Sequence, residues 1–260
     1  MKRVLAPVVC VLACKSGPSP APASTPSASA EDRFRATVDA PDRSEADRKL
    51  DPGRKPAETL AFLEVKPGMK VADLGAGTGY TTELIARAVG ASGKVYMQNE
   101  PTWMPFLKDA IAERFTHPAM KDVVRADVPF DDPVPPGVSG LDLVVMNAIY
   151  HDIANTQVDR LRMNRTVFDA LRPGGAYVVI DSSAPAGSGL SATHTLHRID
   201  ENVVKEEVQK AGFELAAEGS FLRNPEDSRD WNASPPAATR LGKRGQSDRF
   251  ALRFVRPARP

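Results

Sequence analysis

The stretch VADLGAGTGY, residues 71–80, places one carboxylate directly before three glycines. Gly75, Gly77 and Gly79 let the backbone turn sharply and let a ligand approach without a Cβ in the way. The spacing is GxGxG rather than the GxGxxG of dinucleotide-binding loops, and no GxxxxGKS or GxxxxGKT motif occurs in the chain. Because Asp73 would repel a pyrophosphate and attract a cation, the loop predicts a ligand that carries positive charge and no phosphate.

With these residues in place, the chain resembles the class I S-adenosylmethionine-dependent methyltransferases over roughly residues 55 to 220. The resemblance is carried by LEVKPGMKVADLGAGTGYTTELIARAVG, LDLVVMNAIYHD and LRPGGAYVVI. S-adenosylmethionine has an ammonium, a sulfonium and no phosphate, so the resemblance implies that Asp73 binds its amino group, directly or through water. The loop amides and the start of the next helix would face its carboxylate. The alternative is a glycine-rich turn in another kind of α/β protein.

The resemblance assigns further cofactor contacts by position. The family acid that binds the ribose hydroxyls aligns with Asn99, so either the neighbouring Glu100 takes this role or an amide replaces the acid. Asp127 matches the acid that accepts a hydrogen bond from the adenine amino group. Asn147 follows the fourth strand, where ligands bind at the carboxyl ends of strands in open α/β sheets. Glu100 and Asp127 could instead be solvated loop acids.

Candidate catalytic residues also follow the fourth strand. Methyl transfer from a sulfonium is an in-line displacement, so an enzyme must align the acceptor, exclude water and remove a proton from an OH or NH. Tyr150 and His151 lie where the family places catalytic or substrate-binding residues. We predict His151 as the general base, with Asp152 as an orienting acid. The alternative is that Tyr150 and His151 only shape the cofactor pocket.

Two more histidines lie in THTLHRID, past the fifth strand. His194 and His197 would share one face of a helix, and they are candidates to bind substrate or to act as base. No HExxH motif occurs, so we predict no metal site. A metal-assisted enzyme using His151, His194 and His197 remains an alternative. Arg198 could hold an acidic substrate or form an ordinary surface salt bridge, and His117 is predicted to lie in a surface turn.

Alternating strands and helices are predicted to position these residues. The predicted strands cover residues 69–74, 94–98, 123–126, 141–146, 176–180, 213–217 and 250–255. The predicted helices cover residues 56–65, 80–89, 104–115, 157–171 and 201–211. This order predicts an α/β protein with a mostly parallel sheet and helices on both faces. The resemblance makes it a doubly wound, seven-stranded, Rossmann-like fold in a single domain, residues 34–260.

Length and charge limit the classes of partner. The chain has 260 residues with 42% hydrophobic content, which is enough for one sizeable core. A formal net charge of +1 excludes the strong positive field typical of nucleic-acid binding, so the expected partner is a small-molecule substrate. Both cysteines, Cys10 and Cys14, lie near the start, and the body of the chain therefore has no disulfide and no cysteine nucleophile.

The first residues predict export. Lys2 and Arg3 precede a short apolar run that ends at Cys14, and residues 1–14 resemble a bacterial lipoprotein signal peptide. Residues 15–33 are rich in Pro, Ser and Ala, which predicts a tether. These features imply a protein of the cell envelope or periplasm, bound to the membrane only through a lipid on Cys14. An ordinary secretory signal or a chance apolar start are the alternatives.

Residues 222–248 show no clear periodicity and predict a flap. Trp231 could cover a substrate there, or could simply pack at the periphery. Together with the exported start, RNPEDSRDW resembles a group of bacterial exported methyltransferase-like proteins. The favoured function is a methyltransferase with a small-molecule or envelope-exposed acceptor. The alternative is a non-catalytic envelope binding protein that keeps the fold and binds an adenosyl compound or another ligand. Asn99 favours this alternative slightly, and the intact loop favours the enzyme.

Overall fold

The computed structural model describes residues 23–24 and 28–258. The predicted signal peptide, the predicted lipid anchor at Cys14 and the first part of the predicted tether lie outside the described residues. Helix α1 (Ala28–Val38) begins inside the segment predicted as a tether. Among the described residues, none of the helices combines the length and the apolar character that crossing a membrane requires.

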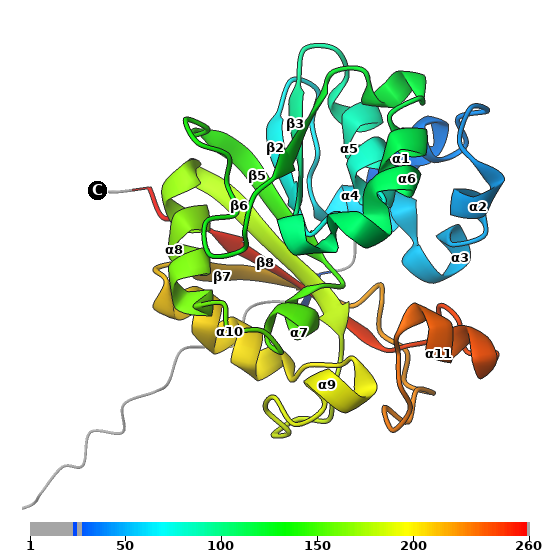
Figure 1. Ribbon diagram of the computed structural model, residues 1–260, viewed down its shortest axis with the longest axis vertical. Helices are drawn as coiled ribbons and strands as arrows, with labels where there is room; N and C mark the ends of the chain where they lie inside the picture. The colour runs from blue at the N-terminus through cyan, green and yellow to red at the C-terminus, as the bar shows by residue number, and fades with distance from the viewer. Residues whose placement is uncertain (1–22, 25–27, 259–260) are drawn as a thin grey trace, which may run out of the picture.

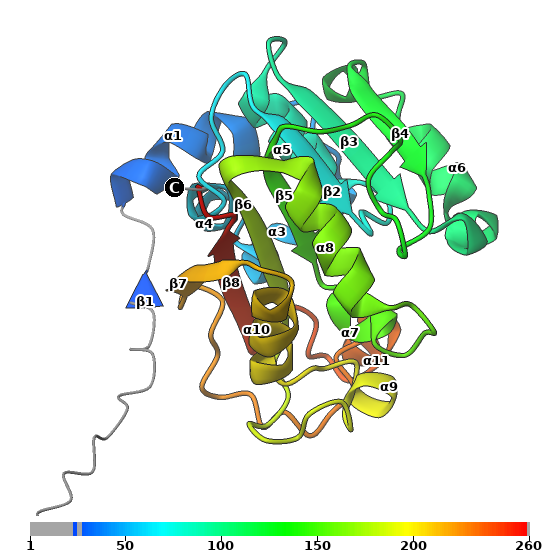
Figure 2. The ribbon, with the colours of Figure 1, turned by 90° about the vertical axis from the view of Figure 1, so that its left-hand side faces the viewer.

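One twisted sheet runs through the centre of the molecule (Figures 1 and 2). Its strands are β1 (Ala23–Ser24), β2 (Lys70–Leu74), β3 (Lys94–Asn99), β4 (Val123–Asp127), β5 (Leu141–Asn147), β6 (Leu171–Ser182), β7 (Glu214–Gly219) and β8 (Arg249–Val255). Their order is β1-β7-β8-β6-β5-β2-β3-β4, and only β8 runs antiparallel to its neighbours. The predicted seven-stranded, mostly parallel sheet is confirmed, and the two-residue β1 adds to its edge.

Helices cover both faces of the sheet. The longer ones are α4 (Pro56–Phe62), α5 (Tyr80–Val89), α6 (Met104–Arg114), α8 (Arg160–Ala170) and α10 (Glu201–Lys210). The short ones are α2 (Glu45–Arg48), α3 (Asp51–Arg54), α7 (Tyr150–Ile153), α9 (Thr193–Leu196) and α11 (Pro235–Arg240), with single turns at Pro101–Trp103 and Pro118–Met120. Alternate residues of the strands face two separate apolar clusters, so the arrangement is doubly wound.

Local chemistry explains where the predicted bounds differ. Helix α8 begins three residues later than predicted because Asp159 caps it, accepting a hydrogen bond from the backbone amide of Arg162. Strand β6 begins five residues earlier than predicted, because its pairing with β5 already starts at Leu171. The register then shifts before Ala176, which accommodates the RPGG turn as an irregularity inside the strand.

The predicted flap, residues 222–248, folds back over the carboxyl ends of the strands and contains α11 (orange in Figure 1). A fully buried ion pair anchors it, with Arg198 Nη1 2.8 Å from Asp227 Oδ2. Trp231 lies over the Arg198 guanidinium and donates its Nε1–H to Asp227 at 2.7 Å. Arg198 therefore forms a salt bridge with the flap, but the pair is fully buried rather than at the surface as predicted.

Candidate functional site

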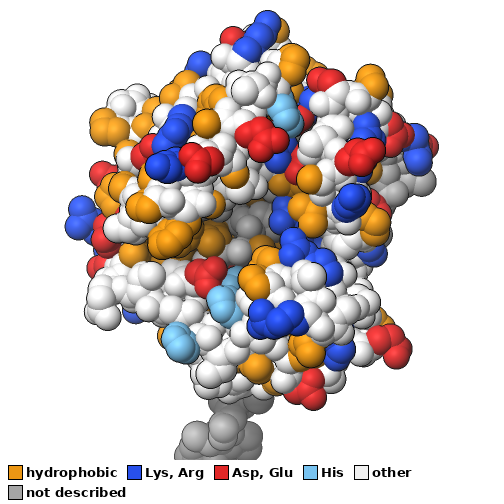
Figure 3. Space-filling model, turned by 45° about the vertical axis from the view of Figure 1, so that its right-hand side comes forward, with side chains coloured by type: hydrophobic (Ala, Val, Ile, Leu, Met, Phe, Trp, Pro, Cys, Tyr) orange, Lys and Arg blue, Asp and Glu red, His pale blue; other side chains and the backbone are white. Residues whose placement is uncertain are grey.

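A cavity of about 630 Å³ opens at the carboxyl ends of β2, β5 and β6, and we call it the carboxyl-end cavity. Its walls come from the glycine loop after β2, from α3, from α7, from the residue after α9 and from residues 231–249. Figure 3 shows the hollow, with Lys and Arg side chains gathered along one rim and His and acidic side chains along the other. Parallel strands bring these segments to one edge of the sheet, although they are distant in sequence.

Asp73 is the buried acid of this cavity. Its side chain is 1% exposed, and Oδ2 accepts a hydrogen bond of 2.6 Å from the Thr82 hydroxyl. Burial raises the pKa of Asp73 to about 7, and the Thr82 hydrogen bond only partly offsets this. A carboxylate that is held out of water with so little compensation favours a cationic ligand beside it.

The glycine loop is tied down by two side chains of β3. Gln98 Oε1 accepts from the Gly75 amide at 2.8 Å, and Asn99 Oδ1 accepts from the Gly77 amide at 2.8 Å. Gly75 has a φ of 62°, and a Cβ there would lie 2.8 Å from Ile149 Cγ1. Gly77 has a φ of 58°, and a Cβ there would meet nothing within 4 Å. The loop is thus rigid on its sheet side and open on its cavity side.

The other predicted cofactor residues have different surroundings. Asn147 lines the cavity as predicted, with Nδ2 3.4 Å from the Thr81 hydroxyl. Asn99 is buried and uses both polar atoms on Gly77, because its Nδ2 also donates to the Gly77 carbonyl at 3.0 Å. Glu100 accepts from the Phe130 amide, and Asp127 is exposed and pairs with Arg125. None of Asn99, Glu100 and Asp127 lines the carboxyl-end cavity, so their predicted ribose and adenine contacts stay predictions.

His151 stands at the polar end of the cavity. Its Nδ1 lies 2.7 Å from Asp181 Oδ1, and its backbone amide donates to Asp181 Oδ2 at 2.9 Å. This carboxylate fixes the tautomer that carries the proton on Nδ1, so Nε2 faces Asp152 and His197. Burial opposes the charged imidazole, but Asp181 and, more weakly, Asp152 raise the pKa of His151 above its ordinary value.

His197 joins His151 and Asp152 in one cluster. Its Nδ1 lies 3.3 Å from His151 Nε2 and 3.2 Å from Asp152 Oδ1. Helix α9 ends at Leu196, and His197 follows in the left-handed conformation with a φ of 49°. This backbone conformation is costly for a residue with a Cβ and is often found at functional sites.

Two predicted catalytic residues do not reach the cavity. The Tyr150 hydroxyl is fully buried in the core, where it donates to Glu207 at 2.7 Å and accepts from Asn164 at 2.9 Å. His194 is exposed on α9 and does not line the cavity. It shares no helical face with His197, because the helix ends between them. Tyr150 and His194 thus lie outside the lining of this cavity, and their predicted catalytic roles stay predictions. His117, predicted in a surface turn, is half-buried and contacts Glu83.

Five basic side chains also line the cavity, and sequence reasoning missed them: Lys49, Arg54, Lys243, Arg244 and Arg249. We call them the cation wall. Within residues 23–24 and 28–258, no carboxylate lies within ion-pair distance of any of them. Among the residues that the structure describes, Asp73 and Asp152 are the acids that line the cavity. Burial, reinforced by the neighbouring Arg54, lowers the pKa of Arg249 to about 10, so this wall gains from a bound anion.

Asp181 and Gln98 are the other residues that the sequence reasoning missed. Asp181 stands at the end of the strand predicted over residues 176–180, next to the fourth strand in the sheet. An acid at the carboxyl end of a buried strand is a signal that could have identified it. Gln98 ends the second strand beside the glycine loop, but nothing in its residue type indicates a bond to the Gly75 amide.

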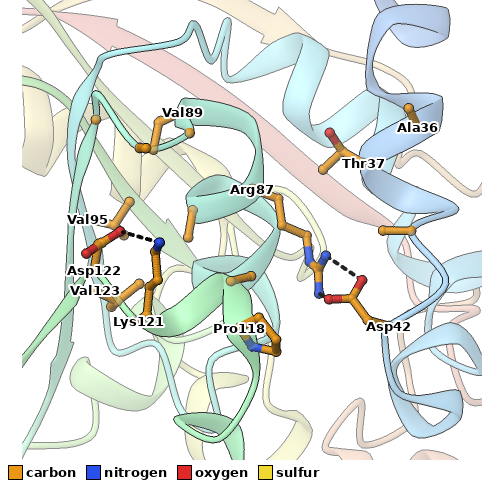
Figure 4. Close-up of a pocket in the computed structure, with 16 residues that line it drawn as sticks. Ala36, Thr37, Asp42, Arg87, Val89, Val95, Pro118, Lys121, Asp122 and Val123 are labelled. Atoms are coloured by element: carbon orange, nitrogen blue, oxygen red, sulfur yellow. Dashed lines mark hydrogen bonds and ion pairs between the residues drawn. The ribbon is translucent and has the colours of Figure 1, made fainter.

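A second cavity of about 500 Å³ lies at the opposite ends of the strands, near the amino ends of β3 and β4. We call it the amino-end cavity. Figure 4 shows Arg87 directed toward Asp42 and Lys121 toward Asp122. The rest of the labelled lining is mainly apolar, including Val89, Val95 and Val123. No predicted site residue lies here.

Comparison with known proteins identifies the class of fold. The chain has the Rossmann-like fold of class I S-adenosylmethionine-dependent methyltransferases, with the same strand order. A SAM-dependent methyltransferase from Aquifex aeolicus superposes with a TM-score of 0.56 at 18% identity, covering 81% of this chain and 96% of that one. Fibrillarin from Aeropyrum pernix, crystallised with natively bound S-adenosyl-L-methionine, gives 0.50 at 14% identity, covering 76% and 74%.

Sequence comparisons point the same way over shorter spans. The profile of the protein-L-isoaspartate(D-aspartate) O-methyltransferase family matches residues 33–101, about a quarter of the chain. The ubiquinone/menaquinone biosynthesis C-methyltransferase UbiE of Idiomarina loihiensis is 26% identical over 143 residues. That alignment covers 54% of this chain and 53% of the relative, so the chain spans about half the length of the curated relatives it matches.

Proposed function

We propose that this protein is an S-adenosylmethionine-dependent methyltransferase with a small anionic acceptor. One observation carries the proposal: a single cavity joins a buried, only partly compensated carboxylate and an open glycine loop to a histidine cluster and a cation wall without carboxylate partners among the described residues. The matched family profile and the UbiE relatives, which are named as methyltransferases, support the same reaction class.

The residues on the cofactor side fit S-adenosylmethionine. Asp73 would bind the amino group, and the space beside the Gly77 Cα admits a ligand without a Cβ in the way. Asn147 and Thr81 line the same part of the cavity. When bound, the cofactor supplies a methyl group on a sulfonium, so the leaving group is already activated. The chain itself must place the acceptor, keep water out and handle the acceptor's proton.

The residues on the acceptor side select charge and handle a proton. His151 presents Nε2 to the cavity while Asp181 holds its Nδ1. That arrangement lets Nε2 take a proton from an acceptor hydroxyl or amine. The cofactor's single carboxylate needs one cationic partner at most, and the cation wall offers five. The surplus positive charge favours an acceptor with a carboxylate, phosphate or sulfate group.

Isothermal titration with S-adenosylmethionine and S-adenosylhomocysteine tests the cofactor. We expect both to bind, and we expect Asp73→Ala to weaken S-adenosylmethionine binding by roughly 10- to 100-fold, the usual effect of losing a charged hydrogen bond. Asp42→Ala, in the amino-end cavity, is the matched control and should bind normally. If the unmodified protein binds neither compound, the proposed function is wrong.

Turnover separates the enzyme from a non-catalytic binder. Small carboxylic acids, phosphate esters and phenols are offered with S-adenosylmethionine, and S-adenosylhomocysteine is measured. Product formation that His151→Ala abolishes supports the enzyme. Tight cofactor binding without turnover on acids, esters or phenols favours the alternative, an adenosyl-binding protein of the envelope.

We also propose that the protein is exported and held in the envelope by a lipid on Cys14. The support is the basic, then apolar, run that ends in VLAC at residues 11–14. Fractionation of cells expressing the full chain should place it in the membrane fraction, and Cys14→Ser should release it. Equal distribution of both forms would contradict the anchor.

A further inference from the structure

We propose that His151, Asp152 and His197 bind a divalent transition-metal ion at the acceptor end of the carboxyl-end cavity. These are the residues, among those described, whose ligand atoms converge: His151 Nε2, Asp152 Oδ1 and His197 Nδ1. The sequence predicts no metal site, and the metal-assisted alternative uses His194, which is exposed and does not line the cavity. In the structure, Asp152 rather than His194 is the third candidate ligand.

The distances between the three atoms suit a shared ion. They are 3.4 Å from His151 Nε2 to Asp152 Oδ1, 3.2 Å from Asp152 Oδ1 to His197 Nδ1, and 3.3 Å between the two nitrogens. Ligands at ordinary bond lengths of about 2.1 Å lie about 3.0 Å apart in octahedral and about 3.4 Å apart in tetrahedral geometry. All three edges of this triangle fall in that interval.

The surroundings hold the ligands in place. Asp181 binds His151 Nδ1, and a carboxylate on the far nitrogen is the usual partner of a metal-bound histidine. The Asp181 carboxylate is fully buried, so this partner is built into the core. The Thr193 hydroxyl donates to Asn155 Oδ1 at 2.7 Å, which joins the start of α9 to the loop after α7 and so helps hold the two ligand-bearing segments together.

The donor set indicates the class of ion and of ligand. Two imidazoles and one carboxylate suit Zn²⁺, Fe²⁺, Co²⁺ or Ni²⁺ rather than Ca²⁺ or Mg²⁺. His197 and Asp152 keep 33% and 36% of their side-chain surface exposed, so further coordination positions face the cavity. An oxygen of the acceptor could occupy one of them, with its anionic group toward the cation wall.

A bound ion would change the role proposed for His151. Its Nε2 lone pair would hold the metal, and the ion would lower the pKa of a bound acceptor hydroxyl, whose proton leaves to solvent. This role at the acceptor rests on the proposed function. Ion binding itself does not depend on it.

Cobalt(II) titration of the purified, metal-stripped full chain tests the site, followed by visible absorption and repeated with Zn²⁺ by calorimetry. We expect one ion per chain, and at least a 10-fold loss of affinity in His197→Ala and in Asp152→Asn. Asp181→Asn should lose about 10- to 100-fold, as outer-shell partners of metal ligands do. His194→Ala is the matched control, because it removes an exposed histidine three residues away, and it should bind normally.

Two outcomes overturn the metal site: no stoichiometric Co²⁺ or Zn²⁺ binding, or an equal loss in His194→Ala and His197→Ala. Circular dichroism and S-adenosylmethionine titration of each variant show whether it still folds. Cofactor binding that persists without metal binding removes only the metal site. Metal binding without cofactor binding removes only the proposed function.

Discussion

The two cavities of this protein have similar volumes, but their charged side chains differ in whether they are paired. In the amino-end cavity, Arg87 lies 2.8 Å from Asp42 and 2.7 Å from Glu83, so its charge is satisfied within the fold. In the carboxyl-end cavity, neither the cation wall nor Asp73 has an ion-pair partner within 4.0 Å among the described residues, and the charge of Arg54 only partly offsets the burial of Asp73. Folding alone does not favour such unpaired charges, because each costs desolvation free energy.

The difference favours the carboxyl-end cavity as the candidate binding site. Volume does not distinguish the two, and apolar lining occurs in both. The carboxyl-end cavity combines unpaired charge, left-handed backbone at Ala148 and His197, and an open glycine, and these features together indicate a ligand.

Removing the buried anchor of the flap should cost far more than removing the ion pair of the amino-end cavity. Asp227→Ala leaves the Arg198 guanidinium buried without its partner, which typically destabilises by about 3–5 kcal/mol. Asp42→Ala removes a half-exposed partner of Arg87 and should cost about 0–1 kcal/mol. Urea unfolding of both variants measures the two free energies. Similar losses would mean that the flap is not held by this pair.

Cofactor affinity should fall as the solution becomes more acidic. The pKa of Asp73 is raised to about 7, so the carboxylate is ionised above that pH and protonated below it. Because the ionised form attracts the cofactor's ammonium, binding should weaken about 10-fold from pH 8 to pH 6. Titration calorimetry across that range measures this slope, and Asp73→Asn should abolish it. A slope that persists in Asp73→Asn would assign it to another group.

Single substitutions in the cation wall should have smaller effects on anion binding. Inorganic phosphate serves as the probe, followed by the fluorescence of Trp231, which lines the cavity, with Trp103→Phe removing the other tryptophan. Arg244→Ala should weaken phosphate binding by about 3- to 10-fold, because one of several charges is lost. Lys121→Ala, in the amino-end cavity, should change it by less than about 2-fold. Equal effects would mean that net charge, not the wall, attracts the anion.

Much of the scaffold could be predicted because local patterns dictate it. A strand, a helix and the glycine loop are each identified by their own sequence signal. The strand at residues 141–146 is a nearly continuous apolar run, the helix over residues 80–89 has helical spacing of apolar residues, and the loop has its three glycines. The same signals predict Asp73, Gly77 and Asn147 as residues of the binding cleft, and all three line the carboxyl-end cavity.

The acceptor end of the cavity could not be predicted as fully, because the segments that form it show no helical or strand periodicity of apolar residues. The cation wall combines α2–α3 with residues 243–249, which are almost 200 residues apart in sequence. His197 lies beside His151 because α9 ends at Leu196 and His197 adopts the left-handed conformation. No residue type in this segment predicts that conformation. Tyr150 points into the core because its hydroxyl forms hydrogen bonds with Glu207 and Asn164. These bonds depend on the packing of α8 and α10, which the sequence pattern does not reveal.

The long connection between β7 and β8 contributes one part of the cavity lining, and the parallel strands contribute another. Gly219 and Ala251 are paired neighbours and β8 begins at Arg249, so residues 220–248 leave the sheet and return to it at one place. The parallel strands β2, β3 and β5 carry the glycine loop, whereas this hairpin excursion supplies Trp231, Lys243 and Arg244. Under the proposed function, exchanging this excursion alone would therefore alter the acceptor that is methylated while leaving Asp73 and the glycine loop in place.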